Sequence, residues 1–138
     1  MLVADDIHTD ILLNKDENAI ITTVAICSPN EEYAKEYKAL WDTGSQNSSI
    51  SKRVADELHL CQVTTTNTIG ATGNMSKPVY LINFAFNSVQ KLASNIYVTG
   101  DINMPGDFDV IIGMDIIKLG KMEINTNDHA LFFRFKFR

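Results

Sequence analysis

The sequence contains little cysteine and no long apolar run. Among its 138 residues there are 2 Cys, 3 Pro and 1 Trp. Cys27 and Cys61 lie far apart and match no metal-binding spacing, so we expect free thiols, with a disulfide as the alternative. No apolar stretch approaches the ~20 residues that a membrane-spanning helix needs, which argues against a protein of that kind.

Basic residues are also few. Lys and Arg total 12 against 17 Asp and Glu, which gives a formal net charge of −5. An acidic chain is repelled by the phosphate backbone, so we expect no nucleic-acid partner. The first residues, Met1 to Asp6, contain neither a basic segment nor a long apolar one. They therefore predict no signal peptide and a cytoplasmic protein. The length fits one domain, and the apolar fraction of 45% permits a modest core.

A chemically distinctive segment follows a short apolar run near residue 40. The run ends at Trp41 and is followed by Asp42-Thr43-Gly44-Ser45, so a carboxylate stands at the end of a predicted buried strand. Burying a carboxylate is costly unless hydrogen bonds satisfy it. The Gly44 backbone N–H and the Ser45 hydroxyl are candidate donors to Asp42. Gly44 has no Cβ and therefore allows a sharp turn and the close approach of another group.

Two further segments stand downstream. Residues 109–115, Asp-Val-Ile-Ile-Gly-Met-Asp, place apolar residues and Gly113 before a predicted short helix at residues 116–119, for which Asp115 is the expected N-cap. Gly113 follows Asp42 by 71 positions, since 113 − 42 = 71. Between these segments, residues 68–74 contain Gly70 and Gly73, which favour a hairpin tip that can bend.

In this order, the three segments resemble those of the retropepsin-like aspartic proteases, the single-domain proteases of retroviral type. Asp42-Thr43-Gly44-Ser45 is similar to the active-site loop of that family, residues 68–74 to its glycine-rich flap, and residues 109–115 to its second hallmark. The resemblance covers most of the chain from residue 40 onward. It implies an all-β fold with one or two short helices, which forms a closed barrel with one lobe per chain. We expect an N-terminal arm over residues 1–18 and the protease domain over residues 19–138.

The resemblance also implies a chemistry. Asp42 would be catalytic, with Thr43, Gly44 and Ser45 supporting it. The chain contains one Asp-Thr-Gly, so an active enzyme requires a homodimer that brings two copies of Asp42 to its symmetry axis. Two facing carboxylates share one proton and activate water against a peptide or protein substrate, without a metal or cofactor. The residues expected to bind substrate are Leu40, Ile69, Gly70, Ala71, Thr72, Gly73 and Ile111.

The chain also departs from the retroviral pattern, and other interpretations stay open. Gln46 and Asn47 stand where retroviral enzymes have acids, and Met114 stands where they have Arg, so these partners of an intersubunit ion-pair network are missing. The same fold could serve as a catalytically silent dimeric peptide-binding or scaffold module. Leu40 and Ile111 could be core residues, and the glycine-rich segment could be an ordinary hairpin tip.

Three other kinds of site are disfavoured. A phosphate-binding loop needs Lys and Ser or Thr after the glycines, where this chain has Asn74 and Met75. A serine-type triad using Ser45 and His59 lacks the nucleophile-elbow sequence. A calcium loop at residues 101–109 lacks the terminal Glu.

Alternating and β-branched patterns predict the remaining elements. Ser51 should cap a short helix over residues 52–58, whose Val54 and Leu58 face the core. Residues 99–107 contain two glycines and a proline and should form a loop. The predicted strands cover residues 11–13, 19–27, 37–41, 64–67, 79–86, 92–98 and 108–112, and a hairpin pairs residues 122–124 with 130–137.

Overall fold

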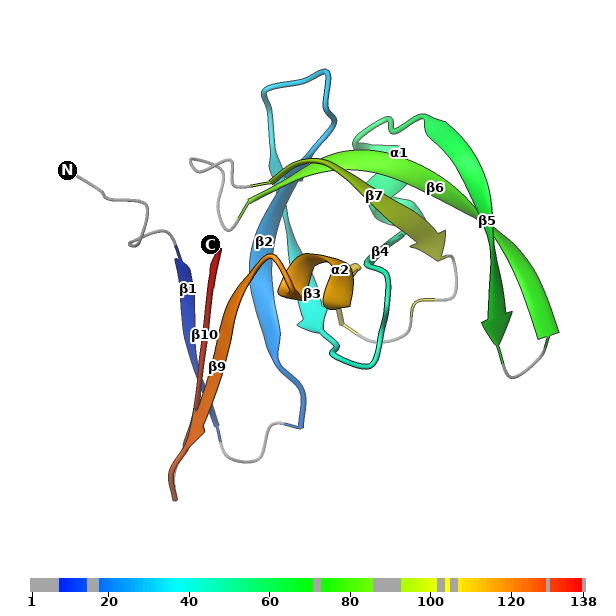
Figure 1. Cartoon of the computed structure of the whole chain (residues 1–138). Coiled ribbons are helices and arrows are strands. Elements are labelled where there is room, and N and C mark those ends of the chain that lie inside the picture. Colours follow the sequence, from blue (N-terminus) through cyan, green and yellow to red (C-terminus); the bar gives the residue numbers. More distant parts are fainter. Residues whose placement is uncertain are drawn as a thin grey trace.

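The structure, a computed structural model, describes residues 8–14, 18–70, 73–85, 93–101, 104, 107–128 and 130–137. These residues form a mainly β fold with two short helices, α1 (Lys52–Glu57) and α2 (Met114–Ile117) (Figure 1). This confirms the fold class expected from the sequence. The strands are β1 (His8–Asn14), β2 (Ile21–Cys27), β3 (Lys35–Trp41), β4 (Ser49–Ser51), β5 (Gln62–Gly70), β6 (Gly73–Ala85), β7 (Ala93–Asp101), β8 (Val110–Ile112), β9 (Gly120–Thr126) and β10 (Ala130–Phe137).

The larger sheet closes on itself. Its strand order is β2-β3-β8-β4-β7-β6-β5, and an additional pairing joins β2 to β6. Because β2 and β6 pair, the strands between them form a ring, and β5 extends from it on β6. Within the ring, β8 runs parallel to β3 and antiparallel to β4. The ring therefore brings the ends of β3, β4 and β8, which are distant in sequence, to one place.

A smaller sheet packs against this ring and has the order β1-β10-β9. In β10, Phe alternates with basic residues, which gives the strand one apolar face, and Phe133 and Phe135 on that face are fully buried. The Trp41 ring, at the end of β3, lies 4.9 Å from each of these two rings, centroid to centroid. The aromatic contacts join the smaller sheet to the strand that precedes Asp42.

Several predicted elements are confirmed, with shifted boundaries. The Ser51 hydroxyl accepts a hydrogen bond from the Val54 amide at the start of α1, and Val54 and Leu58 are buried. The hairpin of β9 and β10 forms as predicted. The short strand expected at residues 11–13 is part of the longer β1, which pairs with β10 along its whole length. The division between an arm and a domain at residue 18 stays a prediction.

The loop predicted over residues 99–107 begins later than expected. Strand β7 continues to Asp101 because its last residues pair in parallel with β4, which the local sequence does not reveal. Gly100 contributes to this, since a Cβ there would lie 2.8 Å from the Tyr80 ring and 3.0 Å from Pro78. Glycine thus lets β7 pass close to β6, where its loop-forming tendency suggested a break.

Candidate active site

Asp42 directly follows β3, a strand that lies inside the ring and not at an edge of the sheet. The strand pairs with β2 on one side and β8 on the other, and Ala39 and Trp41 are buried. Immediately after it, the Asp42 amide donates to the Ile112 carbonyl at 2.9 Å. The side chain of Asp42 is half-buried, so the acid emerges from the core at the edge of the ring. The structure thus confirms the prediction that Asp42 stands at the end of an apolar strand.

The loop after Asp42 folds back on the carboxylate. The Gly44 amide donates to Asp42 Oδ1 at 2.9 Å, as expected, and the Ser45 amide donates to the Asp42 carbonyl at 3.2 Å. A Cβ on Gly44 would lie 3.2 Å from Asp42 Oδ1, so glycine makes room for this approach. The expected bond from the Ser45 hydroxyl to Asp42 is wrong. That hydroxyl donates to the Asn47 carbonyl at 2.7 Å, which is nearer along the turn.

The structure brings the second segment, 71 positions away in sequence, against this loop. The Met114 amide donates to the Ser45 carbonyl at 2.8 Å, and the Asp115 amide donates to the Gln46 carbonyl at 3.2 Å. A Cβ on Gly113 would lie only 2.7 Å from the Ser45 carbonyl oxygen. Gly113 is therefore required by a close approach of two backbones, which explains its place before α2.

Asp115 does not cap α2 as the sequence suggested. The N-cap is Gly113, without a side-chain hydrogen bond, and Asp115 lies in the first turn. Its carboxylate instead accepts from Ser48, through the hydroxyl at 2.6 Å and the amide at 2.9 Å, and from the Ile116 amide at 2.9 Å. Ser48 is fully buried, and its hydroxyl oxygen also accepts from the Gly113 amide at 2.9 Å. Sequence reasoning missed Ser48, because nothing distinguishes it from the neighbouring serines.

The glycine-rich segment forms the end of a long hairpin of β5 and β6, which extends away from the ring (Figure 1). Gly70 pairs with Gly73 at the last described position, and Gly73 has a φ of 111°, a conformation that side chains disfavour. Ile69 is 89% exposed, so most of its apolar side chain faces solvent. The other two flap residues predicted to bind substrate, Ala71 and Thr72, lie outside the described residues.

A groove of about 540 Å³ lies beside Asp42. It separates the end of β3 from the smaller sheet, and Ile124 of β9 is 48% exposed within it. Its lining residues are Asn18, Ala19, Ile20, Leu40, Trp41, Asp42, Thr43, Met122, Ile124 and Leu131. Leu40 thus shares a groove with the acid. Ile111, half-buried and paired with Leu40, does not line it, and neither do Ile69, Gly70 and Gly73.

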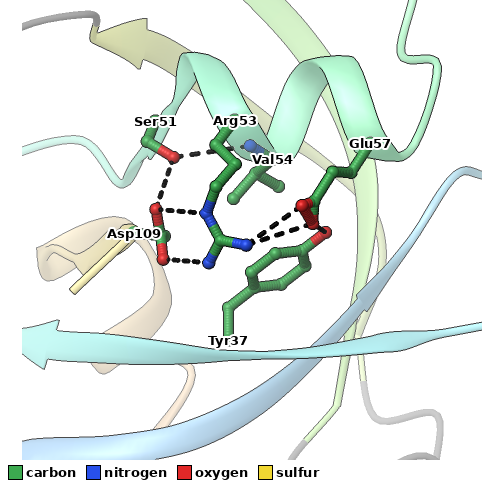
Figure 2. A network of polar contacts seen from close by, with 6 residues as sticks. All are labelled: Tyr37, Ser51, Arg53, Val54, Glu57 and Asp109. Carbon is green, nitrogen blue, oxygen red and sulfur yellow. Dashed lines mark hydrogen bonds and ion pairs between the residues drawn. The ribbon is translucent and has the colours of Figure 1, made fainter. Parts of the chain in front are cut away.

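A second polar cluster lies at the other end of β8 (Figure 2). Arg53 of α1 binds the Asp109 carboxylate through its Nε and Nη2 atoms, and the Ser51 hydroxyl donates to Asp109 Oδ1 at 2.9 Å. The bond from Arg53, aided by that from Ser51, holds the pKa of Asp109 below its usual value. The Tyr37 hydroxyl donates to Glu57 at 3.2 Å, and burial, reinforced by Glu57, raises the pKa of Tyr37 to about 12. The cluster fastens α1 to β3 and β8.

Metal binding and membrane insertion have no support among the residues that the structure describes. No group of three or more His, Cys, Asp or Glu side chains in this part of the chain could hold a metal ion. Neither described helix is long and apolar enough to cross a membrane. Cys27 and Cys61 are free thiols, as expected, the first buried and the second exposed.

Comparison with known proteins reveals a fold but no close relative in sequence. No protein-family model and no curated protein matches the chain. A retropepsin-like aspartic protease from Rickettsia conorii matches with a TM-score of 0.59 and 14% identity, over 95% of this chain and 94% of that one. EIAV protease, solved with the inhibitor HBY-793, matches with a TM-score of 0.51 and 19% identity, over 75% of this chain and 89% of that one. The chain therefore has the fold of the retropepsin-like aspartic proteases.

Proposed function

We propose that the chain is an aspartic endopeptidase that acts as a homodimer, with Asp42 of each copy as the catalytic residue. The observation that carries this proposal is the construction around Asp42. The acid stands at the end of a central buried strand, accepts the Gly44 amide, and borders an open groove. Both the loop and the turn that supports it come from the segments that resemble the family.

A second copy is required by the chemistry. Peptide hydrolysis by carboxylates needs one ionised and one protonated group side by side, and two carboxylates about 3 Å apart meet this need because they cannot both ionise. The chain offers one Asp-Thr-Gly. A twofold axis that passes beside Asp42 supplies the second acid from the same residue of the other copy. Thr43, next to Asp42, is exposed, which leaves this side of the loop available for such an approach.

In the dimer, the ionised Asp42 accepts a proton from water as the oxygen attacks the peptide carbonyl carbon. The protonated Asp42 donates a hydrogen bond to the carbonyl oxygen and stabilises the tetrahedral intermediate. The leaving nitrogen then takes a proton from the pair, and the C–N bond breaks. No metal, cofactor or covalent intermediate takes part. The Gly44 amide contributes by fixing the direction of the carboxylate.

The substrate is a peptide or protein segment in an extended conformation. The hairpin end at Ile69, Gly70, Ala71, Thr72 and Gly73 would close over it as a flap, and its backbone would pair with the peptide in the manner of an added strand. Exposure of Ile69 leaves its side chain available for this contact. Leu40 and Ile111 would border the subsites next to the cleaved bond. We place this activity in the cytoplasm, consistent with the two free thiols.

The decisive experiment compares the wild type with Asp42→Asn on a mixed peptide library from acidic to neutral pH. Asparagine keeps the size of the side chain and removes its charge, so the variant should fold normally and cleave nothing. Cleavage by the wild type alone supports the proposal. Binding of peptides by both proteins without cleavage at any pH contradicts it and favours the peptide-binding module with the same fold.

A further inference from the structure

Two serine–aspartate pairs stand at the two ends of the short β4–β8 ladder. Ser48 and Asp115, the proximal pair, lie at the end where β3 leads into Asp42. Ser51 and Asp109, the distal pair, lie at the opposite end. In each pair a serine hydroxyl donates to Oδ1 of the carboxylate, at 2.6 Å in the proximal pair and 2.9 Å in the distal pair. The same chemistry thus occurs once beside the candidate site and once away from it.

The proximal pair is part of a continuous set of contacts that reaches the Asp42 loop. Ser48 ends that loop, and its amide and hydroxyl both donate to the Asp115 carboxylate. The amides of Met114 and Asp115 donate to carbonyls of the loop itself, at Ser45 and Gln46. The side chain and the backbone around Asp115 therefore act on one segment, the one that positions Asp42.

We propose that Asp115 is a positioning residue, which acts through Ser48 to hold the loop of residues 42–48 in the geometry that hydrolysis needs. This inference rests on the proposed function and adds to it a second essential carboxylate that touches no substrate. The Ser48 amide donates to Oδ2 of Asp115 and the Ile116 amide donates to Oδ1, so each oxygen faces a group that can only donate. The position therefore requires a carboxylate or another pure acceptor. Asparagine would place a donor against a donor on one of the two carboxylate oxygens, whichever way its amide is turned.

The distal pair provides a matched control. Asp109 is held by Arg53 in addition to Ser51, and it supports α1 and the beginning of β8 (Figure 2). Its loss removes a serine–aspartate bond of the same kind, and its hydrogen bonds join it to Lys38, Ser51 and Arg53, all of which lie outside the loop of residues 42–48. Asp115→Asn is therefore compared with Asp109→Asn, and Ser48→Ala with Ser51→Ala. Each comparison makes the same substitution at the two ends of one ladder.

The first measurement is kinetic. With a peptide that the wild type cleaves, the proximal variants should lower kcat by roughly 10- to 100-fold with KM within about twofold, because a displacement of the reacting group on the order of 1 Å has this effect. The distal variants should keep kcat within about twofold, even where they lower the melting temperature. A wild-type kcat in folded Ser48→Ala, or equal losses of kcat in the proximal and distal variants, overturns the proposal.

The second measurement does not depend on activity. Hydrogen exchange, resolved by residue, is followed at the amides of Gly44, Ser45 and Met114, none of which bonds to either side chain of the proximal pair. Ser48→Ala should accelerate exchange at these amides by about tenfold or more through local opening, and Ser51→Ala should not. Unchanged exchange in Ser48→Ala overturns the positioning role. If the wild type cleaves no peptide, the proposed function fails, and exchange alone decides whether Asp115 positions the loop.

Discussion

The indole of Trp41 and the hydroxyl of Thr22 share a buried hydrogen bond, in which Trp41 Nε1 donates to Thr22 Oγ1 at 2.8 Å. Trp41 is the residue immediately before Asp42, and its ring lies between β3 and the Phe side chains of β10. The bond fixes the orientation of the indole, which the aromatic contacts alone leave free to slide. The placement of the acid and the packing of the smaller sheet thus depend on one side chain.

Thr22→Val should lower the free energy of unfolding by about 1–3 kcal/mol, because valine preserves the shape and leaves a buried indole N–H without an acceptor. The measurement is denaturant unfolding followed by fluorescence of the single Trp. Thr23→Val is the matched control, since the neighbouring Thr23 is exposed and its substitution should change stability by less than about 0.5 kcal/mol. Equal stability of the two variants would show that the bond contributes nothing.

Gly113→Ala should destabilise the protein by about 1–3 kcal/mol, because its new methyl group would stand against backbone that has little room to move. The nearest atom, the Ser45 carbonyl oxygen, would be 2.7 Å away. Gly44→Ala should have a smaller effect on stability, since its Cβ would lie 3.2 Å from a side-chain oxygen of Asp42. Denaturant unfolding of both variants gives the order. If Gly113→Ala is the more stable of the two, the close approach is not limiting.

Local signals in the sequence were sufficient for most of the strands and for the position of Asp42, and the resemblance of three short segments to a known family supplied the fold. The apolar run before Asp42 and the alternating Phe residues of β10 each require only neighbouring residues to be interpreted. The loop after Asp42, the hairpin end and the turn at Gly113 were recognisable because each has its own short pattern of glycine and polar residues.

The missed features depend on partners distant in the sequence. Asp115 stands two residues after Gly113 and before a helical segment, which locally favours capping, yet Ser48, 67 positions away, provides two of the donors to its carboxylate. In the sequence, the Asp42 carboxylate and the Asn47 carbonyl were both possible acceptors for the Ser45 hydroxyl. The path of the turn places the hydroxyl against the Asn47 carbonyl. The extension of β7 similarly follows from parallel pairing with β4. Such choices require the tertiary structure.

Tyr37 should make the protein sensitive to alkaline pH. Burial and Glu57 raise its pKa in the folded state from 10.0 to about 12, so folding favours the neutral hydroxyl. This contribution to stability is complete below pH 10 and is lost as the pH rises through 12, because the unfolded chain ionises first. Denaturant unfolding at about pH 9 and about pH 11.5 measures the loss. Tyr37→Phe should reduce it, whereas Tyr33→Phe, at an exposed position, should not. Equal losses in the two variants would contradict the assignment.

Mixing wild-type and Asp42→Asn chains tests whether each active site contains one acid from each of two copies. At concentrations where the chain is dimeric, adding an equal amount of Asp42→Asn to a fixed amount of wild type should reduce the cleavage rate to about half once subunits exchange. The reason is that random pairing converts wild-type chains into mixed dimers, in which only one carboxylate remains and no proton can be shared. Bovine serum albumin added at the same mass is the control for nonspecific effects. A rate that does not change after full exchange would mean that a single chain supplies all the catalytic groups, and the dimeric mechanism would then be wrong.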